Sequence, residues 1–127
     1  MELKLIIFDV DGTLYDLKSH CIPQSCTEAI RQLKRNKIRF AIASGRAHYG
    51  MGKALNDLRA DYIIADSGGV IVDSEGNMLY HEDMPFAECC QLLEFARQEE
   101  AGLVFKFPQH MYIYQHPEKV PLKGYNP

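Results

Sequence analysis

The sequence contains no cluster of basic residues, no long apolar stretch and no cysteine pair with the spacing of a zinc site. Its net charge is −3 over 127 residues. Because nucleic acids and anionic membrane surfaces are bound through clustered Lys and Arg side chains, we expect neither as a partner. The apolar stretches have the length of strands, so no membrane-spanning helix is predicted.

The cysteines also argue against a metal centre or a disulfide framework. The sequence has no C-x-x-C pair, and His20-Cys21 with Cys26 is the nearest approach to a metal-ligand cluster. We interpret all four cysteines as reduced, mostly buried thiols. The first residues include an acid and lead directly into an apolar segment, unlike a secretory signal. We therefore expect a cytoplasmic protein.

The first half of the chain predicts an α/β fold. A hydrophobic content of 46% can form a buried core, and the length fits one ordinary domain. Three apolar segments predict strands, and two stripes at helical spacing separate them. This βαβαβ order is typical of a doubly wound parallel sheet, in which we expect the first strand to be covered on both faces. The strands are predicted at residues 3–8, 38–43 and 60–65, and the stripes are Cys26, Ala29, Ile30 and Leu33, then Met51, Ala54, Leu55 and Leu58.

The first predicted helix carries recognisable end signals. Ser25 and Glu28 have the spacing of a capping box, and Pro23 comes just before them. Basic residues between Lys34 and Lys37 suit the carboxyl-terminal end of a helix. We therefore predict that side chains cap the start of this helix.

The second half of the chain has a different pattern. Residues 70–73 and 78–81 flank a short polar segment and predict a β-hairpin. A helical stripe from Phe86 to Ala96 then precedes two predicted strands, at residues 103–107 and 111–115. We divide the chain into a core unit, residues 1–83, and a partial αββ unit, residues 84–127.

Two acids directly follow the first predicted strand. Asp9 and Asp11 are two residues apart, and Gly12 and Thr13 come next. The carboxyl ends of strands are where open α/β sheets bind ligands. Paired acids there can hold a divalent cation, attack an electrophile or transfer protons. The sequence therefore predicts a chemical site at this position.

Other interpretations of these acids are possible. An EF-hand loop is excluded, because its fifth and sixth positions would be Thr13 and Leu14. In a purely structural interpretation, Asp11 and Gly12 form an ordinary turn and Asp9 caps a helix. That interpretation does not explain why an acid directly follows a mostly aliphatic strand.

These residues resemble the haloacid dehalogenase superfamily, and in particular its Cof-type sugar-phosphate phosphatase branch. The segment from Asp9 to Leu14 is similar to the family's first motif. The segment from Ala43 to Arg46, at the end of the second predicted strand, is similar to the second motif. The turn at Asp66 to Gly69, with its hairpin and the αββ run, is similar to the entry into the cap domain of this branch. The resemblance covers essentially the whole chain.

The resemblance implies a phosphatase acting on a small phosphorylated metabolite, with Mg²⁺ as cofactor. Asp9 is implied as the nucleophile that forms an aspartyl-phosphate, and Asp11 as the general acid and base. Both acids are implied as Mg²⁺ ligands, Asp11 through its backbone carbonyl. The other implied residues bind the phosphoryl group or the substrate: Gly12, Thr13, Ser44, Gly45 and Arg46.

Simpler roles remain open for some of these residues. Ser44 could be only the N-cap of the following helix. Arg46 could be a solvated residue in the first turn of that helix. Ser67 stands where the branch usually has Asn, so its role in shaping the substrate site is doubtful.

The sequence also departs from the family. Full members are considerably longer and return from the cap to the core with a lysine and a Gly-Asp-x-x-x-Asp motif, neither of which is found here. We expect the chain to stop within the cap, to bind Mg²⁺ weakly and to leave a sheet edge uncovered. An uncovered edge predicts a homo-oligomer, such as a dimer about a two-fold axis. The alternative function is an impaired remnant that serves as a phosphate-binding or protein-interaction module.

Overall fold

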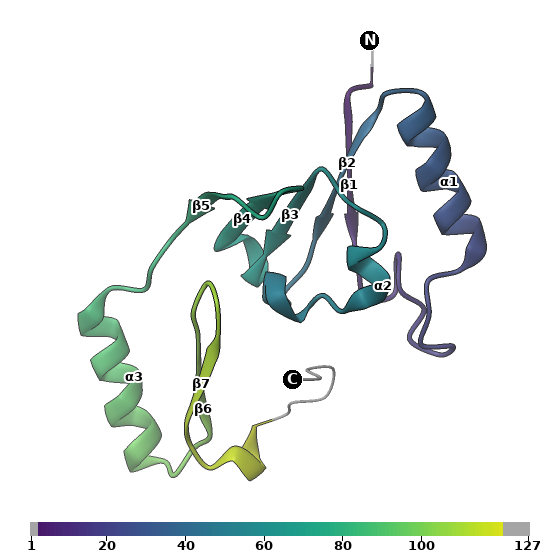
Figure 1. Ribbon diagram of the computed structural model, residues 1–127. Helices are drawn as coiled ribbons and strands as arrows, with labels where there is room; N and C mark the ends of the chain where they lie inside the picture. The colour runs from purple at the N-terminus through teal and green to yellow at the C-terminus, as the bar shows by residue number, and fades with distance from the viewer. Residues whose placement is uncertain (1–2, 121–127) are drawn as a thin grey trace. The chain divides into compact units, whose positions relative to one another are not determined.

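The apolar segments of the first half form a five-stranded sheet in the computed structural model, which describes residues 3–120 (Figure 1). The strands lie in chain order, and β1 is parallel to β2 and β2 to β3. The hairpin strands β4 and β5 extend the sheet in antiparallel orientation. The α/β fold with its βαβαβ order is therefore confirmed. The strands are β1 (Leu5–Asp9), β2 (Arg39–Ala43), β3 (Tyr62–Ala65), β4 (Val70–Asp73) and β5 (Met78–His81).

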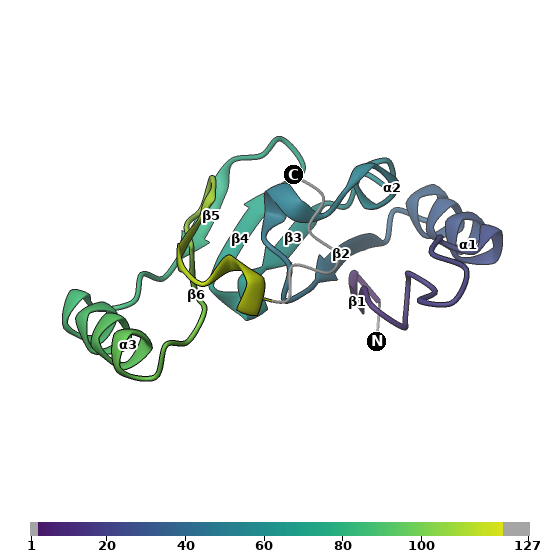
Figure 2. The same cartoon turned by 90° about the horizontal axis from the view of Figure 1, so that it is seen from below.

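The helices of this unit are α1 (Gln24–Arg35) and α2 (Lys53–Asn56), with short 3₁₀ turns η1 (His48–Gly50) and η2 (Asp66–Gly68). Figure 2 shows α1 and α2 on the same side of the sheet. Their apolar side chains pack against this side of the sheet, toward which every second residue of each strand points. We call this side the covered face. The buried core consists of Val10, Leu14, Ile30, Phe40, Ile42, Met51, Leu55, Leu58, Ala60, Ala65, Val70 and Val72.

The prediction that β1 is covered on both faces was wrong. Leu5 is 40% and Ile7 53% exposed, because α1 and α2 both pack on the covered face, on the other side of the sheet. The strand register places apolar side chains of all five strands on this second side. We call it the open face. Its larger apolar residues are Leu5, Ile7, Tyr62, Ile64, Ile71 and Tyr80, and β2 contributes Ala41 and Ala43.

The predicted capping box was also wrong. The helix α1 begins at Gln24 with Pro23 at its N-cap, and no side chain caps it. Ser25 thus lies inside the first turn instead of preceding the helix, so it is not the N-cap that a capping box requires. The basic end has a tertiary role, since Lys34 Nζ donates to the carbonyl of Leu58 at 2.9 Å.

The second helical stripe forms less helix than its spacing predicts. The helix α2 has only four residues, because Gly52 in the left-handed region (φ 77°) separates it from η1 and Arg59 (φ 52°) follows it. Met51 and Leu55 are nevertheless buried in the core. The stripe therefore identified the buried residues, although the backbone between them is interrupted.

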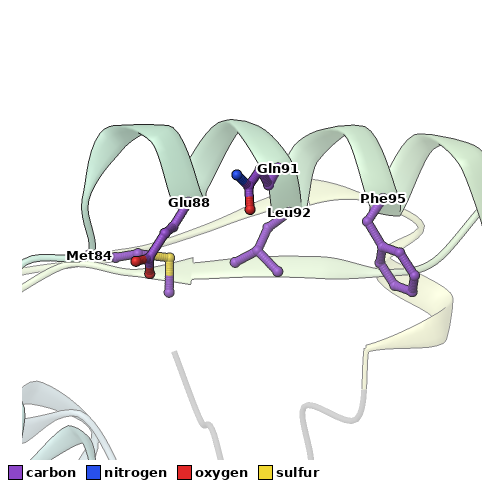
Figure 3. A pocket seen from close by; sticks show the side chains of 5 residues that line it. All are labelled: Met84, Glu88, Gln91, Leu92 and Phe95. Carbon is purple, nitrogen blue, oxygen red and sulfur yellow. The ribbon is translucent and has the colours of Figure 1, made fainter.

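The chain divides into two compact units between His81 and Glu82. The second contains α3 (Phe86–Gln98), the antiparallel pair β6 (Leu103–Lys106) and β7 (Met111–Gln115), and the turn η3 (Pro117–Lys119). Ala96 is its one buried apolar residue among those described. A shallow hollow of about 540 Å³ lies along one side of α3 (Figure 3), lined by Met84, Glu88, Gln91, Leu92 and Phe95.

The four cysteines are free thiols, as predicted, but the prediction that they are mostly buried was wrong. Cys21 and Cys90 are exposed, and Cys26 and Cys89 are half-buried. Cys90 is an exposed residue of α3, and Cys21 lies in a surface loop. Within residues 3–120, no helix has the length and apolar character needed to cross a membrane.

Candidate active site

Two buried apolar side chains anchor the loop after β1. Val10 and Leu14 are buried in the core, while Asp9, Asp11 and Thr13 are exposed. The backbone N–H of Tyr15 donates to the carbonyl of Val10 at 2.8 Å, which closes the loop. The loop therefore holds three polar side chains outward at the carboxyl end of the strand.

Gly12 makes this tight loop possible. Its φ of 85° lies in the left-handed region, which favours glycine. Its N–H donates to the carbonyl of Tyr15 at 2.9 Å. Gly12 therefore serves the site through its backbone conformation, since its N–H is already engaged within the loop.

Asp9 is held by a single side-chain contact. The hydroxyl of Thr13 donates to Asp9 Oδ2 at 3.2 Å. The other carboxylate oxygen, Oδ1, has no hydrogen-bond partner among residues 3–120. One oxygen is thus oriented by the loop while the second stays available to a ligand.

Asp11 forms an ion pair with Arg46, which follows the neighbouring strand β2. Arg46 donates through Nη2 to Asp11 Oδ1 at 2.5 Å and through Nε to Oδ2 at 3.1 Å. The guanidinium also lies over the ring of Tyr15, 5.5 Å from its centroid. A two-pronged pair of this kind restricts both side chains. The structure therefore brings the two sequence motifs together.

Ser44 is the buried polar residue between these motifs, with 9% exposure. Its N–H donates to the carbonyl of Ile64 at 2.9 Å, and its hydroxyl accepts the N–H of Arg46 at 3.1 Å. The next helical turn, η1, has Ala47 at its N-cap. Ser44 is therefore not a helix cap, and Arg46 lies before that turn instead of within it.

A third turn lies beside the second motif. The N–H of Ser67 donates to the carbonyl of Ser44 at 3.1 Å, and the N–H of Asp66 donates to that of Arg46 at 3.0 Å. A Cβ added to Gly45 would lie 3.3 Å from the Ser67 hydroxyl. Gly45 therefore allows the exposed Ser67 side chain to approach the second motif closely.

The turn at Ser67 is conformationally strained. Asp66 (φ 49°) and Ser67 (φ 57°) both occupy the left-handed region, which is uncommon for residues with a side chain. Strain of this kind tends to occur at functional sites. The sequence does not predict that Ser67 and Tyr15 lie beside these motifs, because nothing in their local spacing shows which strand end they adjoin.

The oxygen-rich composition of the site suits a hard cation such as Mg²⁺. The Asp9 carboxylate and the backbone carbonyl of Asp11 are the residues implied for it. The Asp11 carboxylate is already engaged by Arg46. Within the described part of the chain, no group of three or more His, Cys, Asp or Glu side chains could hold a metal ion. Mg²⁺ keeps several water ligands in many proteins, so a site with two protein ligands still fits it.

Known proteins share this sequence pattern. A sequence model of the haloacid dehalogenase-like hydrolases matches residues 6–126. The chain is 32% identical over 98 residues to phosphatase YwpJ of Bacillus subtilis, which covers 76% of this chain and 34% of that protein. It is 33% identical over 93 residues to the HMP-PP phosphatase of Yersinia pestis, which covers 72% of this chain and 32% of that protein.

A solved structure shares the fold. A sugar phosphatase of haloacid dehalogenase subclass IIB matches with a TM-score of 0.80 and 25% identity, over 91% of this chain and 45% of that chain. The chain thus spans about a third of the length of these two curated relatives and less than half of this structure. Since the family match extends over nearly all of the sequence, the chain belongs to the haloacid dehalogenase-like hydrolases.

Proposed function

We propose that this chain carries the nucleophile and the acid/base group of a phosphohydrolase that acts on a small phosphorylated metabolite. The observation that carries the proposal is how the two carboxylate oxygens of Asp9 are engaged. Thr13 holds one of its carboxylate oxygens, and the other is available at the carboxyl end of β1. Asp11 lies two residues after Asp9, on the loop that follows β1. It forms an ion pair with Arg46, which follows the neighbouring strand β2.

The proposed reaction has two steps. In the first, Asp9 Oδ1 forms a bond to phosphorus while the bond from phosphorus to the ester oxygen breaks, and protonated Asp11 gives its proton to the departing alkoxide. In the second, Asp11 accepts a proton from water as the water oxygen bonds to phosphorus. The acyl-phosphate P–O bond then breaks, which releases inorganic phosphate and restores the Asp9 carboxylate.

The other residues of the site position the phosphoryl group. The hydroxyl of Thr13 fixes the orientation of the attacking carboxylate. Ser44 and Gly45 set the backbone path that brings Arg46 to the loop, and Arg46 supplies positive charge beside the phosphate. When bound to Asp9 and the Asp11 carbonyl, Mg²⁺ would offset the repulsion between the carboxylate and the phosphate dianion.

The substrate class rests on relatives. The names of two related proteins refer to HMP-PP and to sugars as the phosphorylated compounds on which they act. The chain itself lacks a basic cluster for nucleic acid. We therefore assign small phosphorylated metabolites as the substrate class.

One observation favours a second function, phosphate binding without turnover. Arg46 engages both carboxylate oxygens of Asp11, so neither oxygen is free to contact the oxygen of a leaving group. In this alternative, the site binds a phosphate group but completes no reaction cycle.

Hydrolysis of para-nitrophenyl phosphate with and without added Mg²⁺ tests the proposal. Replacing Asp9 by Asn should reduce kcat/KM by about 10³-fold or more, because the amide is a poor nucleophile. Asp57→Asn is the matched control, since Asp57 is an exposed acid paired with Lys53 at 2.7 Å. Turnover that Asp9→Asn leaves unchanged would contradict the proposal. Binding of inorganic phosphate to the unaltered protein, without any turnover, would favour the binding function.

A further inference from the structure

Two contacts of different kinds hold the Arg46 side chain at the candidate site. Asp11 accepts hydrogen bonds from Nε and Nη2, along one edge of the guanidinium group. The guanidinium also lies over the ring of Tyr15, with 5.5 Å between its Cζ and the ring centroid. This separation is within the range of a cation–π interaction. Since Nη1 has no hydrogen-bond partner among residues 3–120, another edge of the group is available to a ligand.

The loop after β1 restrains the Tyr15 ring from the backbone and from its tip. The N–H of Tyr15 donates to the carbonyl of Val10 at 2.8 Å, and its carbonyl accepts the N–H of Gly12 at 2.9 Å. The hydroxyl donates to the carbonyl of His20 at 2.8 Å. The side chain is also half-buried against the hydrophobic core. Tyr15 therefore offers a fixed aromatic surface on the loop that carries the two acids.

Arg46 reaches this loop from a different segment of the chain. It follows β2, and its long side chain has many rotamers that a ligand would have to restrict on binding. Only 22% of the side chain is exposed, and a cation–π contact is stronger where water is partly excluded. Because Tyr15 contacts the face of the guanidinium and Asp11 one edge, neither contact occupies Nη1.

We infer that Tyr15 is a positioning residue, which holds Arg46 in the orientation in which Arg46 binds a phosphate group; this rests on the proposed function. Tyr15 acts through Arg46 and does not itself contact the phosphate. A purely structural role is the alternative, in which the Tyr15 hydroxyl closes the loop at His20. The two roles differ in the part of the side chain that matters, the aromatic face or the hydroxyl.

Binding of inorganic phosphate, measured by isothermal titration calorimetry, and hydrolysis of para-nitrophenyl phosphate test this role. Tyr15→Leu keeps apolar bulk but removes the aromatic face, so it should weaken phosphate binding and lower kcat/KM by about fivefold or more. Tyr15→Phe keeps the face and loses the hydrogen bond to His20, so it should retain most of both. Tyr62→Leu is the matched control, because Tyr62 is also half-buried beside an arginine, with Arg39 Nη1 donating to its hydroxyl at 3.2 Å. The control should change neither quantity.

Two further measurements separate positioning from structure. In an Arg46→Ala background, Tyr15→Leu should cause no further loss of kcat/KM, because the partner of the ring is already absent. The NMR signal of the Arg46 Nε–H group needs neither phosphate nor turnover. The Tyr15 ring should shift this signal from the position of an ordinary arginine, and the shift should disappear in Tyr15→Leu and persist in Tyr15→Phe.

Several outcomes would overturn the role of Tyr15. They are a Tyr15→Leu variant that loses no more phosphate affinity than Tyr15→Phe, the same loss of kcat/KM in the Arg46→Ala background, or an Arg46 signal that Tyr15→Leu leaves in place. If circular dichroism shows that Tyr15→Leu is unfolded, Tyr15→Met replaces it, since methionine also lacks an aromatic face and adapts to irregular space. A protein without turnover would contradict the proposed function, whereas the Arg46 signal would still decide whether Tyr15 positions Arg46.

Discussion

The two faces of the five-stranded sheet are built from the same strands but have different surroundings. On the covered face, Phe40 and Ile42 are at most 1% exposed beneath α1 and α2. On the open face, Ile64 and Ile71 of neighbouring strands are half-buried, and Ile7 is 53% exposed. Both sets are aliphatic or aromatic, so residue type alone does not decide burial. The comparison shows that the face beneath α1 and α2 supplies the core, whereas the apolar side chains of the open face are less completely buried.

The largest expected effect on stability comes from a matched pair of variants, one on each face of the sheet. Ile42→Ala on the covered face should lower the free energy of unfolding by about 2–5 kcal/mol, because it removes buried methyl groups and leaves a cavity. Ile7→Ala on the open face should cost about 1 kcal/mol or less, since Ile7 is already 53% exposed. Urea denaturation measures both values.

A milder variant guards this comparison against loss of the fold. Ile42→Val should cost about 0.5–1.5 kcal/mol and remain measurable if the alanine variant is unfolded. Equal losses for Ile42→Ala and Ile7→Ala would show that the open face is covered in solution.

A smaller effect on stability is expected at two turns that contain glycine, one after β1 and one between β4 and β5. Gly12, after β1, and Gly76, between β4 and β5, both have φ of 85° and space for an added Cβ. Replacing either by Ala should cost roughly 1–2 kcal/mol, because a side chain disfavours the left-handed region. Only Gly12→Ala should also reduce phosphatase turnover, since Gly12 shapes the loop that carries Asp9. If Gly76→Ala reduced turnover as much as Gly12→Ala does, the loss would come from lower stability and not from a change in the site.

The smallest expected effect concerns Asp73, which lies at the end of β4. The Asn77 side chain donates to Asp73 Oδ2 at 2.9 Å, and the backbone N–H groups of Glu75 and Asn77 donate to Oδ1. The Asn77 side chain, with these N–H groups, lowers the pKa of Asp73 below its ordinary value of 3.8. A lowered pKa in the folded state contributes stability above the unfolded value and loses it as the pH falls through the folded value.

Asp73→Asn should therefore lower Tm modestly at neutral pH. The difference in Tm from the unaltered protein should shrink as the pH falls below 3.8. Measuring both proteins at each pH cancels the titration of all other carboxylates. A difference that stays constant through acid pH would show that the hairpin gains nothing from the charge of Asp73.

Sequence periodicity predicted the elements of this chain well, and the site less completely. The strands, the hairpin and the αββ order follow from short-range patterns, because apolar alternation and helical spacing reflect local geometry. The capping box failed because Pro23 shifted the helix start by a residue or two. The second helix was interrupted at Gly52, where a left-handed backbone ends the regular spacing.

The candidate site was likewise predicted only in part from the sequence. The placement of Asp9 and Asp11 at a strand end was readable from the apolar segment before them. The ion pair of Asp11 with Arg46 was not, since these residues are 35 positions apart and meet only because β1 and β2 are parallel neighbours. The approach of Ser67 to Gly45 likewise depends on β3 lying beside β2.

By itself the sequence determined the alternation of strands and helices, the acid pair and the family, because each depends on residues close together in the chain. Only the tertiary structure decided which partner holds Asp11, which oxygen of Asp9 is available and which face of the sheet α1 and α2 cover. Those features depend on contacts between distant segments, and hydrophobic patterning does not distinguish an apolar face that is covered from one that is not.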